Sequence, residues 1–162
     1  MIDFCMWLEG TPIALLIRET LWGFPIVVAI HILGLTLSVG TIVWFDLRLL
    51  GLSMTQCPVV TLYRRLIPYA MAGFFVMLVS GGMLLIAYAS NAYGNLYFRI
   101  KMAALFLALA NALVYHLVTE RGIANWNDAR RPPLPARMAG LASIIVWTVA
   151  ILAGRMMSYT MF

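Results

Sequence analysis

The sequence predicts an all-α integral membrane protein, a four-helix bundle with a short N-terminal interfacial helix. Of its 162 residues 64% are hydrophobic, and the mean hydropathy is +0.94. The apolar residues gather in four long runs, and a helix needs about 20 such residues to cross a bilayer core. Backbone groups inside lipid must be paired within the chain, so these runs are expected to be helical.

The first element, residues 1–20, is too short to span and is predicted to lie on the membrane surface. Thr11-Pro12 is typical of a helix start, with threonine as the cap and proline in the first turn. The following residues form an apolar body that ends in charges, flanked by Trp7 and Trp22 as interface anchors. The membrane domain is then predicted to cover residues 21–162.

Four spans follow, and they are interrupted by few polar side chains. The first contains His31 and the third contains His116, while the second has no charged residue. Small residues such as Gly73 and Ser80 recur on one face of the second span, which favours close helix packing. We predict spans at about 21–45, 66–90, 98–119 and 138–158.

The basic residues predict how the chain is oriented. The net charge is +5. Seven of the eleven basic residues lie in the segments 46–65 and 120–137, which join consecutive spans on one side. Because positive loops stay in the cytoplasm, both termini are predicted to lie outside, in the periplasm if the source is a Gram-negative bacterium. The basic residues are interpreted as orienting the chain in the membrane. The lipid bilayer is therefore the expected partner, and nucleic acid is not.

The two histidines are predicted to lie at different depths. At 1.5 Å per residue, His31 lies about 13 Å below the outer interface and His116 about 27 Å below it. One haem iron bound by both histidines is therefore disfavoured. The polar residues instead separate into an outer layer and an inner layer.

The outer layer is the predicted cofactor site. His31 is the candidate ligand, with Met83 opposite it as a second metal ligand, and Lys101 and Arg155 are candidates to pair with haem propionates. The structural alternative is that His31 hydrogen-bonds a neighbouring helix and that Met83 fills space. Lys101 and Arg155 would then extend to the outer interface.

The inner layer is a second polar cluster of His116, Asp46 and Arg48, with Glu120 nearby. Titratable groups at two depths also suit a proton path. The alternative is that His116 is structural, and that Asp46 and Arg48 end the first helix and determine its topology.

Three segments carry a family resemblance: HILGLTLSVGTIVWFDLRLLG, FRIKMAALFLALANALVYH and SIIVWTVAILAGRMMSYT. Together they resemble a bacterial family of small four-helix inner-membrane proteins, catalogued as a domain of unknown function. The resemblance covers most of residues 20–160. It implies the fold and the importance of its polar positions, and it implies no activity. The motif positions are His31, Asp46, Arg48, Lys101, Asn111, His116, Gly154, Arg155 and Tyr159.

Three functions are compatible with these residues. The leading one is a redox or electron-transfer module that binds b-type haem or a quinone around His31. The architecture also resembles cytochrome b561-type and copper-resistance membrane proteins, although a shared architecture does not establish function. The second is copper or proton transport or metal handling, which a chain this short would perform as an oligomer. The third is a non-catalytic subunit of a larger membrane complex. Whether the protein is an enzyme stays open.

Overall fold

The computed structural model describes residues 2–161, with all side chains except those of residues 118–120 and 161. Within these residues the chain is helical and contains no strand. The elements in order are α1 (Ile2–Glu9), α2 (Pro12–Glu19), α3 (Gly23–Leu50), α4 (Val59–Ala87), α5 (Ala89–Gly94), α6 (Leu96–Val114), the π-helix η1 (Tyr115–Thr119), the 3₁₀ helix η2 (Glu120–Asn125) and α7 (Leu134–Met161).

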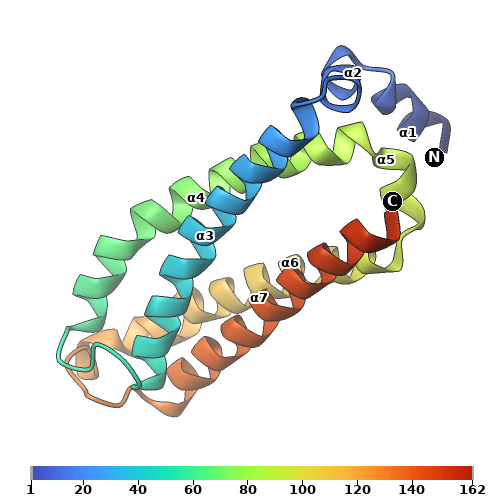
Figure 1. Cartoon of the computed structure of the whole chain (residues 1–162). Helices are drawn as coiled ribbons and strands as arrows, with labels where there is room; N and C mark the ends of the chain where they lie inside the picture. The colour runs from blue at the N-terminus through green and yellow to red at the C-terminus, as the bar shows by residue number, and fades with distance from the viewer. Residues whose placement is uncertain (1, 162) are drawn as a thin grey trace.

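Four of these helices are long and apolar enough to cross a membrane. They cover Gly23–Leu50, Val59–Ala87, Leu96–Leu117 and Leu134–Thr160. The predicted fold class is therefore confirmed, and the chain is a multi-pass membrane protein. Figure 1 shows that the four long helices run side by side and that both ends of the chain lie at the same end of the bundle.

The bundle is built from two helical hairpins, α3 with α4 and α6 with α7, which are joined chiefly where α3 packs against α7. The hairpins are close together at the end formed by residues 51–58 and 126–133, which we name the loop end (Figure 1). They diverge toward the opposite end, where α1, α2 and α5 lie, which we name the terminal end (Figure 1).

The long helices begin and end at different residues from those expected. Helix α3 continues to Leu50 and ends at Gly51, whose φ of +73° allows its N–H to bond the Arg48 carbonyl. Helix α4 begins at Val59, because Asn127 from the distant loop caps its first turn. The backbone carbonyl of Asn127 accepts from the Val59 N–H at 3.0 Å, and its side-chain oxygen accepts from the Val60 N–H at 3.0 Å.

The N-terminal segment contains two short helices where one was predicted. Helix α2 packs against α3 and α4 through the buried Ile17, which lies beside Val27 and Ala87. Glu9 links the segment to the rest of the chain, because its carboxylate accepts a hydrogen bond from the Ser90 N–H at 2.7 Å and pairs with Arg18 at 3.6 Å. Many apolar side chains of α1 and α2 remain exposed.

Helices α3 and α4 cross in very close contact at Gly34 and Gly73. A Cβ atom at Gly73 would lie 2.5 Å from the Ser38 backbone nitrogen and 2.7 Å from the Gly34 carbonyl oxygen. Small residues allow such close approach between helices in lipid, where no hydrophobic force joins them. This crossing determines which residues of α3 and α4 face each other.

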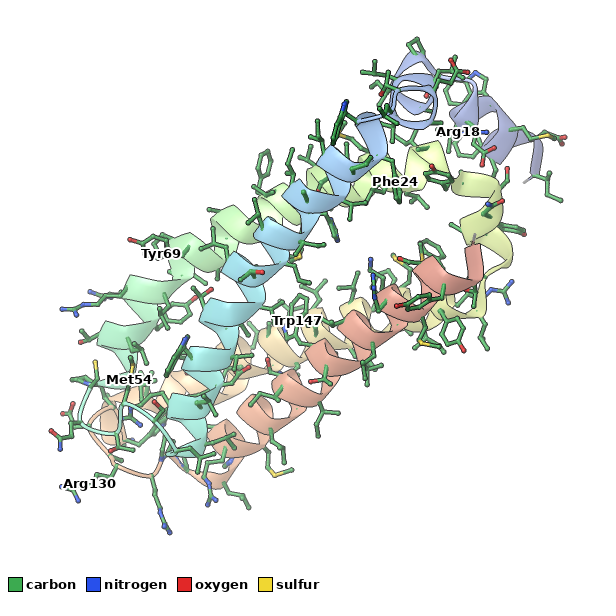
Figure 2. All side chains as sticks on the ribbon, in the orientation of Figure 1. Arg18, Phe24, Met54, Tyr69, Arg130 and Trp147 are labelled. Atoms are coloured by element: carbon green, nitrogen blue, oxygen red, sulfur yellow. The ribbon has the colours of Figure 1, made fainter. Side chains whose placement is uncertain are left out.

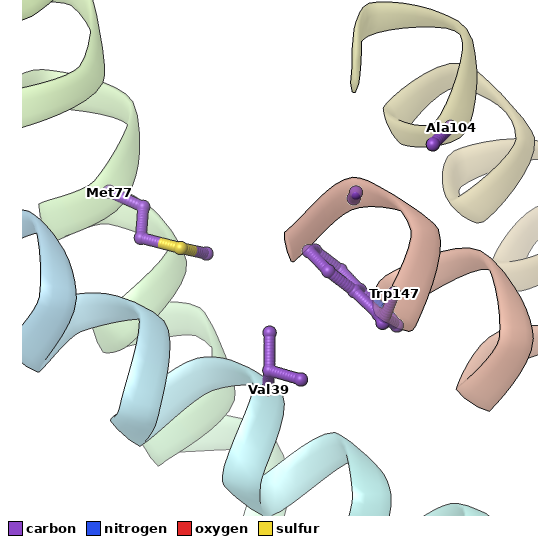
Figure 3. Close-up of a cluster of buried hydrophobic side chains, with 5 residues drawn as sticks. Val39, Met77, Ala104 and Trp147 are labelled. Carbon is purple, nitrogen blue, oxygen red and sulfur yellow. The ribbon is translucent and has the colours of Figure 1, made fainter. Parts of the chain in front are cut away.

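A hydrophobic cluster at the centre of the bundle joins all four long helices. It contains Val39 of α3, Met77 of α4, Ala104 of α6, and Trp147 and Ala150 of α7. Figure 3 shows the Met77 and Val39 side chains pointing toward α7 and the Trp147 ring. The cluster separates the polar residues of the terminal half from those of the loop end.

Candidate functional site

His31 lies in the terminal half of α3, with its imidazole against α4. Its Nδ1 is 2.9 Å from the Ser80 hydroxyl. The ring fits there because residue 81 is glycine. A Cβ atom at Gly81 would lie 3.1 Å from His31 Cε1. The Nδ1 edge of the ring therefore faces α4.

The hydrogen bonds of Ser80 determine the tautomer of a neutral His31. The Ser80 hydroxyl donates its single hydrogen to the Val76 carbonyl at 2.6 Å. It can then only accept from His31, so Nδ1 carries the ring hydrogen. Nε2 is left with its lone pair, which can accept a hydrogen bond or bind a metal ion.

This assignment predicts a signal in nitrogen NMR of the histidine side chains. Because a net hydrogen bond contributes about 1 kcal/mol, the Nδ1–H form of neutral His31 should exceed the Nε2–H form by several-fold. In Ser80→Ala this preference should disappear. His116→Gln leaves a single histidine signal for the measurement. An Nε2–H form that dominates in the protein with Ser80 intact would contradict the assignment.

Lys101 lies at the start of α6 and is half-buried. Its stem runs along the backbone of Gly154 on α7, where a Cβ atom would lie 3.6 Å from Nζ. Its positive charge is close enough to act on His31. Among the described residues, Lys101 has no carboxylate partner and no hydrogen-bond acceptor. The ammonium can therefore donate to an oxygen atom supplied by a ligand.

The other two residues of the predicted outer site are engaged elsewhere. Arg155 is exposed, donates to the Tyr159 hydroxyl at 3.0 Å and lies 4.8 Å above the centre of that ring. Met83 packs against the hydrophobic cluster of Ile17 and Val27 beside α2. The charge of Lys101 thus acts on His31, while Arg155 and Met83 have contacts of their own.

At the loop end, His116 lies in an aromatic cluster. Its ring centre is 5.6 Å from that of Tyr63 and 5.4 Å from that of Tyr115, and Phe45 contacts both tyrosines. The π-helix η1 carries His116 at this point. Tyr63 and Ser80 are 17 residues apart on α4, so the histidine contacts on this helix are about 25 Å apart.

Asp46 and Arg48 occupy two further environments. Asp46 is 4% exposed, and the Ser143 side chain of α7 lies near its carboxyl group. Arg48 is fully buried and donates from Nε to the Cys57 carbonyl at 2.8 Å and from Nη2 to the Ala129 carbonyl at 3.1 Å. The described contacts of His116, Asp46 and Arg48 thus go to different residues, and the side chain of Glu120 lies outside the described residues.

Sequence reasoning missed the residues that define these environments. It interpreted Ser80 only as part of a packing face, although Ser80 and its neighbour Gly81 orient the imidazole. It also missed Ser143 and Asn127, the neighbour of Asp46 and the cap of α4. A signal existed for Ser80, because a lone hydroxyl within an apolar run needs a partner.

The cavities indicate where a larger group could fit. An open, apolar groove of about 330 Å³ lies between α6 and α7, lined by residues such as Ile100 and Val149. A second cavity of about 40 Å³ lies beside Tyr63. Neither cavity borders His31. Among the described residues, no group of three or more His, Cys, Asp or Glu side chains could hold a metal ion.

The fold and these contacts define the class of protein: a four-span, all-α membrane protein with a histidine and a half-buried lysine on its spanning helices. The chain belongs to DUF6644, a family of unknown function, which matches residues 10–160. Comparison with curated proteins and with solved structures finds no match.

Proposed function

We propose that the protein is a redox module of the bacterial inner membrane that binds a quinone between His31 and Lys101. The observation that carries this proposal is the Nε2 lone pair of His31, which follows from the bonds of Ser80, together with the charge of Lys101, which acts on the imidazole and has no ion-pair partner among the described residues. A quinol hydroxyl can donate to Nε2, and the ammonium can donate to a quinone carbonyl oxygen. Ionisable side chains within a membrane usually mark such functional sites.

A b-type haem fits the same residues only in part. Nε2 of His31 could bind the iron, and Lys101 could pair with a propionate. Met83, the expected second ligand, packs in the hydrophobic cluster beside α2, and Arg155 hydrogen-bonds the Tyr159 hydroxyl. A quinone headgroup is smaller and needs only His31 and Lys101. We therefore favour the quinone.

The proposal is tested by replacing His31 with glutamine. We expect the variant to bind a short-chain quinol analogue about tenfold more weakly, because the hydrogen bond from the quinol hydroxyl to Nε2, worth about 1–1.5 kcal/mol, is lost. Quinone that copurifies with the wild-type protein should fall in parallel. The matched control is His116→Gln at the loop end, which should bind the analogue as the wild type does.

The same purified protein distinguishes the alternatives. A haem absorption band in the wild type that is lost in His31→Gln would show that the site binds haem and not a quinone. Bound copper would point instead to metal handling. A folded protein that binds neither quinone nor haem would overturn the redox proposal altogether.

The orientation in the membrane is part of this proposal. We infer that the loop end faces the cytoplasm, because exposed arginines concentrate there, and that the His31 site lies in the periplasmic half. A C-terminal fusion to a phosphatase that is active only outside the cytoplasm is expected to be active. Activity of a fusion placed in residues 51–58, with an inactive C-terminal fusion, would reverse the assignment.

A further inference from the structure

Six exposed arginines surround the loop end of the bundle. Within the described part of the chain, none of them forms an ion pair or a hydrogen bond, and the ion pair that the structure does contain, Arg18 with Glu9, lies at the terminal end. Figure 2 shows Arg130 projecting away from the bundle at the loop end. The six residues are Arg64, Arg65, Arg121, Arg130, Arg131 and Arg137, and we name them the arginine surface.

The arginine surface is held on a fixed backbone. Arg48 bonds the carbonyls of Cys57 and Ala129, so one buried guanidinium ties together the two loops. Asn127 caps α4, which carries Arg64 and Arg65 on its next turn. The Arg130 carbonyl lies against Gly51, where a Cβ atom would be 3.1 Å away. Arginines that are distant in sequence are thus held on segments of backbone that are bonded to one another.

The side chains of the arginine surface are suited to binding phosphate. Arg137 lies in the first turn of α7, at the level where a spanning helix leaves the hydrocarbon and meets lipid headgroups. One guanidinium group can donate two parallel hydrogen bonds to two oxygens of a phosphate, whereas an ammonium acts as a point charge. Ten of the eleven basic residues in the chain are arginines. Orientation in the membrane requires only positive charge, so it does not explain this preference.

We propose that the arginine surface is a binding site for anionic phospholipid headgroups, with the two phosphates of cardiolipin as its best ligand. Basic sites between spanning helices are known to recognise such headgroups. The site is independent of the proposed quinone site, because it lies at the opposite end of the bundle.

The test compares lipid binding by native mass spectrometry after reconstitution with cardiolipin or phosphatidylcholine. The wild-type protein should retain cardiolipin and melt at a higher temperature with it. At about 1 kcal/mol for each arginine near the anionic lipid, the double variant R64Q/R130Q should bind cardiolipin roughly thirtyfold more weakly. R64K/R130K, which keeps the charge, should lie between this variant and the wild type.

The matched control is R18Q/R99Q, which removes the same charge from the terminal end and should bind cardiolipin as the wild type does. Equal binding of cardiolipin and phosphatidylcholine by the wild type would overturn the proposal. So would an equal loss of binding in R18Q/R99Q, since binding would then follow total charge. Circular dichroism checks that all variants are folded.

Discussion

Replacing Arg48 with methionine is expected to lower the free energy of unfolding by about 4 kcal/mol. The guanidinium is fully buried and donates two hydrogen bonds, to the carbonyls of Cys57 and Ala129. Each hydrogen bond from a charged donor contributes about 1.5–3 kcal/mol, and a buried carbonyl left without a donor adds a penalty. Methionine retains most of the stem, so the loss reports mainly on the polar contacts.

The measurement for Arg48→Met is unfolding in mixed detergent micelles, together with limited proteolysis. Both loops of the loop end, residues 51–58 and 126–133, should become sensitive to protease, because the same side chain holds both. The control is Arg65→Met on the exposed face of α4, which should change stability by less than about 0.5 kcal/mol. Equal effects of the two substitutions would contradict the role assigned to Arg48.

Replacing Gly73 with alanine is expected to destabilise the α3–α4 hairpin by about 3 kcal/mol. The added Cβ would lie 2.5 Å from the Ser38 nitrogen and 2.7 Å from the Gly34 oxygen. Both are backbone atoms that no rotamer change can move away, so the two helices must separate. Overpacking of this kind costs 1–3 kcal/mol, and occasionally more.

The control for Gly73→Ala is Gly40→Ala, because a Cβ atom there meets no neighbour within 4 Å. That variant should be neutral or more stable by up to about 1 kcal/mol, since alanine favours a helix over glycine. The Gly73 variant should also weaken the His31–Ser80 bond and with it the tautomer preference, because both residues lie on the displaced helices. A Gly73 variant with wild-type stability would show that the crossing is looser than described.

The four spans and the separation of the two histidines could be predicted from the sequence because they depend on local properties. An apolar run can be recognised within about 25 consecutive residues, and the rise per residue of a helix gives the depth of each position in the membrane. His31 accordingly contacts Ser80 in the terminal half, while His116 contacts Tyr63 at the loop end.

Only the tertiary structure decided what each polar residue does. The bond between His31 and Ser80 joins residues 49 apart, and that between Arg48 and Ala129 joins residues 81 apart. Both depend on which helix faces meet, and the glycine crossing at Gly73 determines this for α3 and α4. For the same reason Asp46 and Arg48, two residues apart on α3, point toward different neighbours and form no cluster. The spans follow from composition along the chain, whereas the site follows from packing between helices, which a single sequence does not encode in any local pattern.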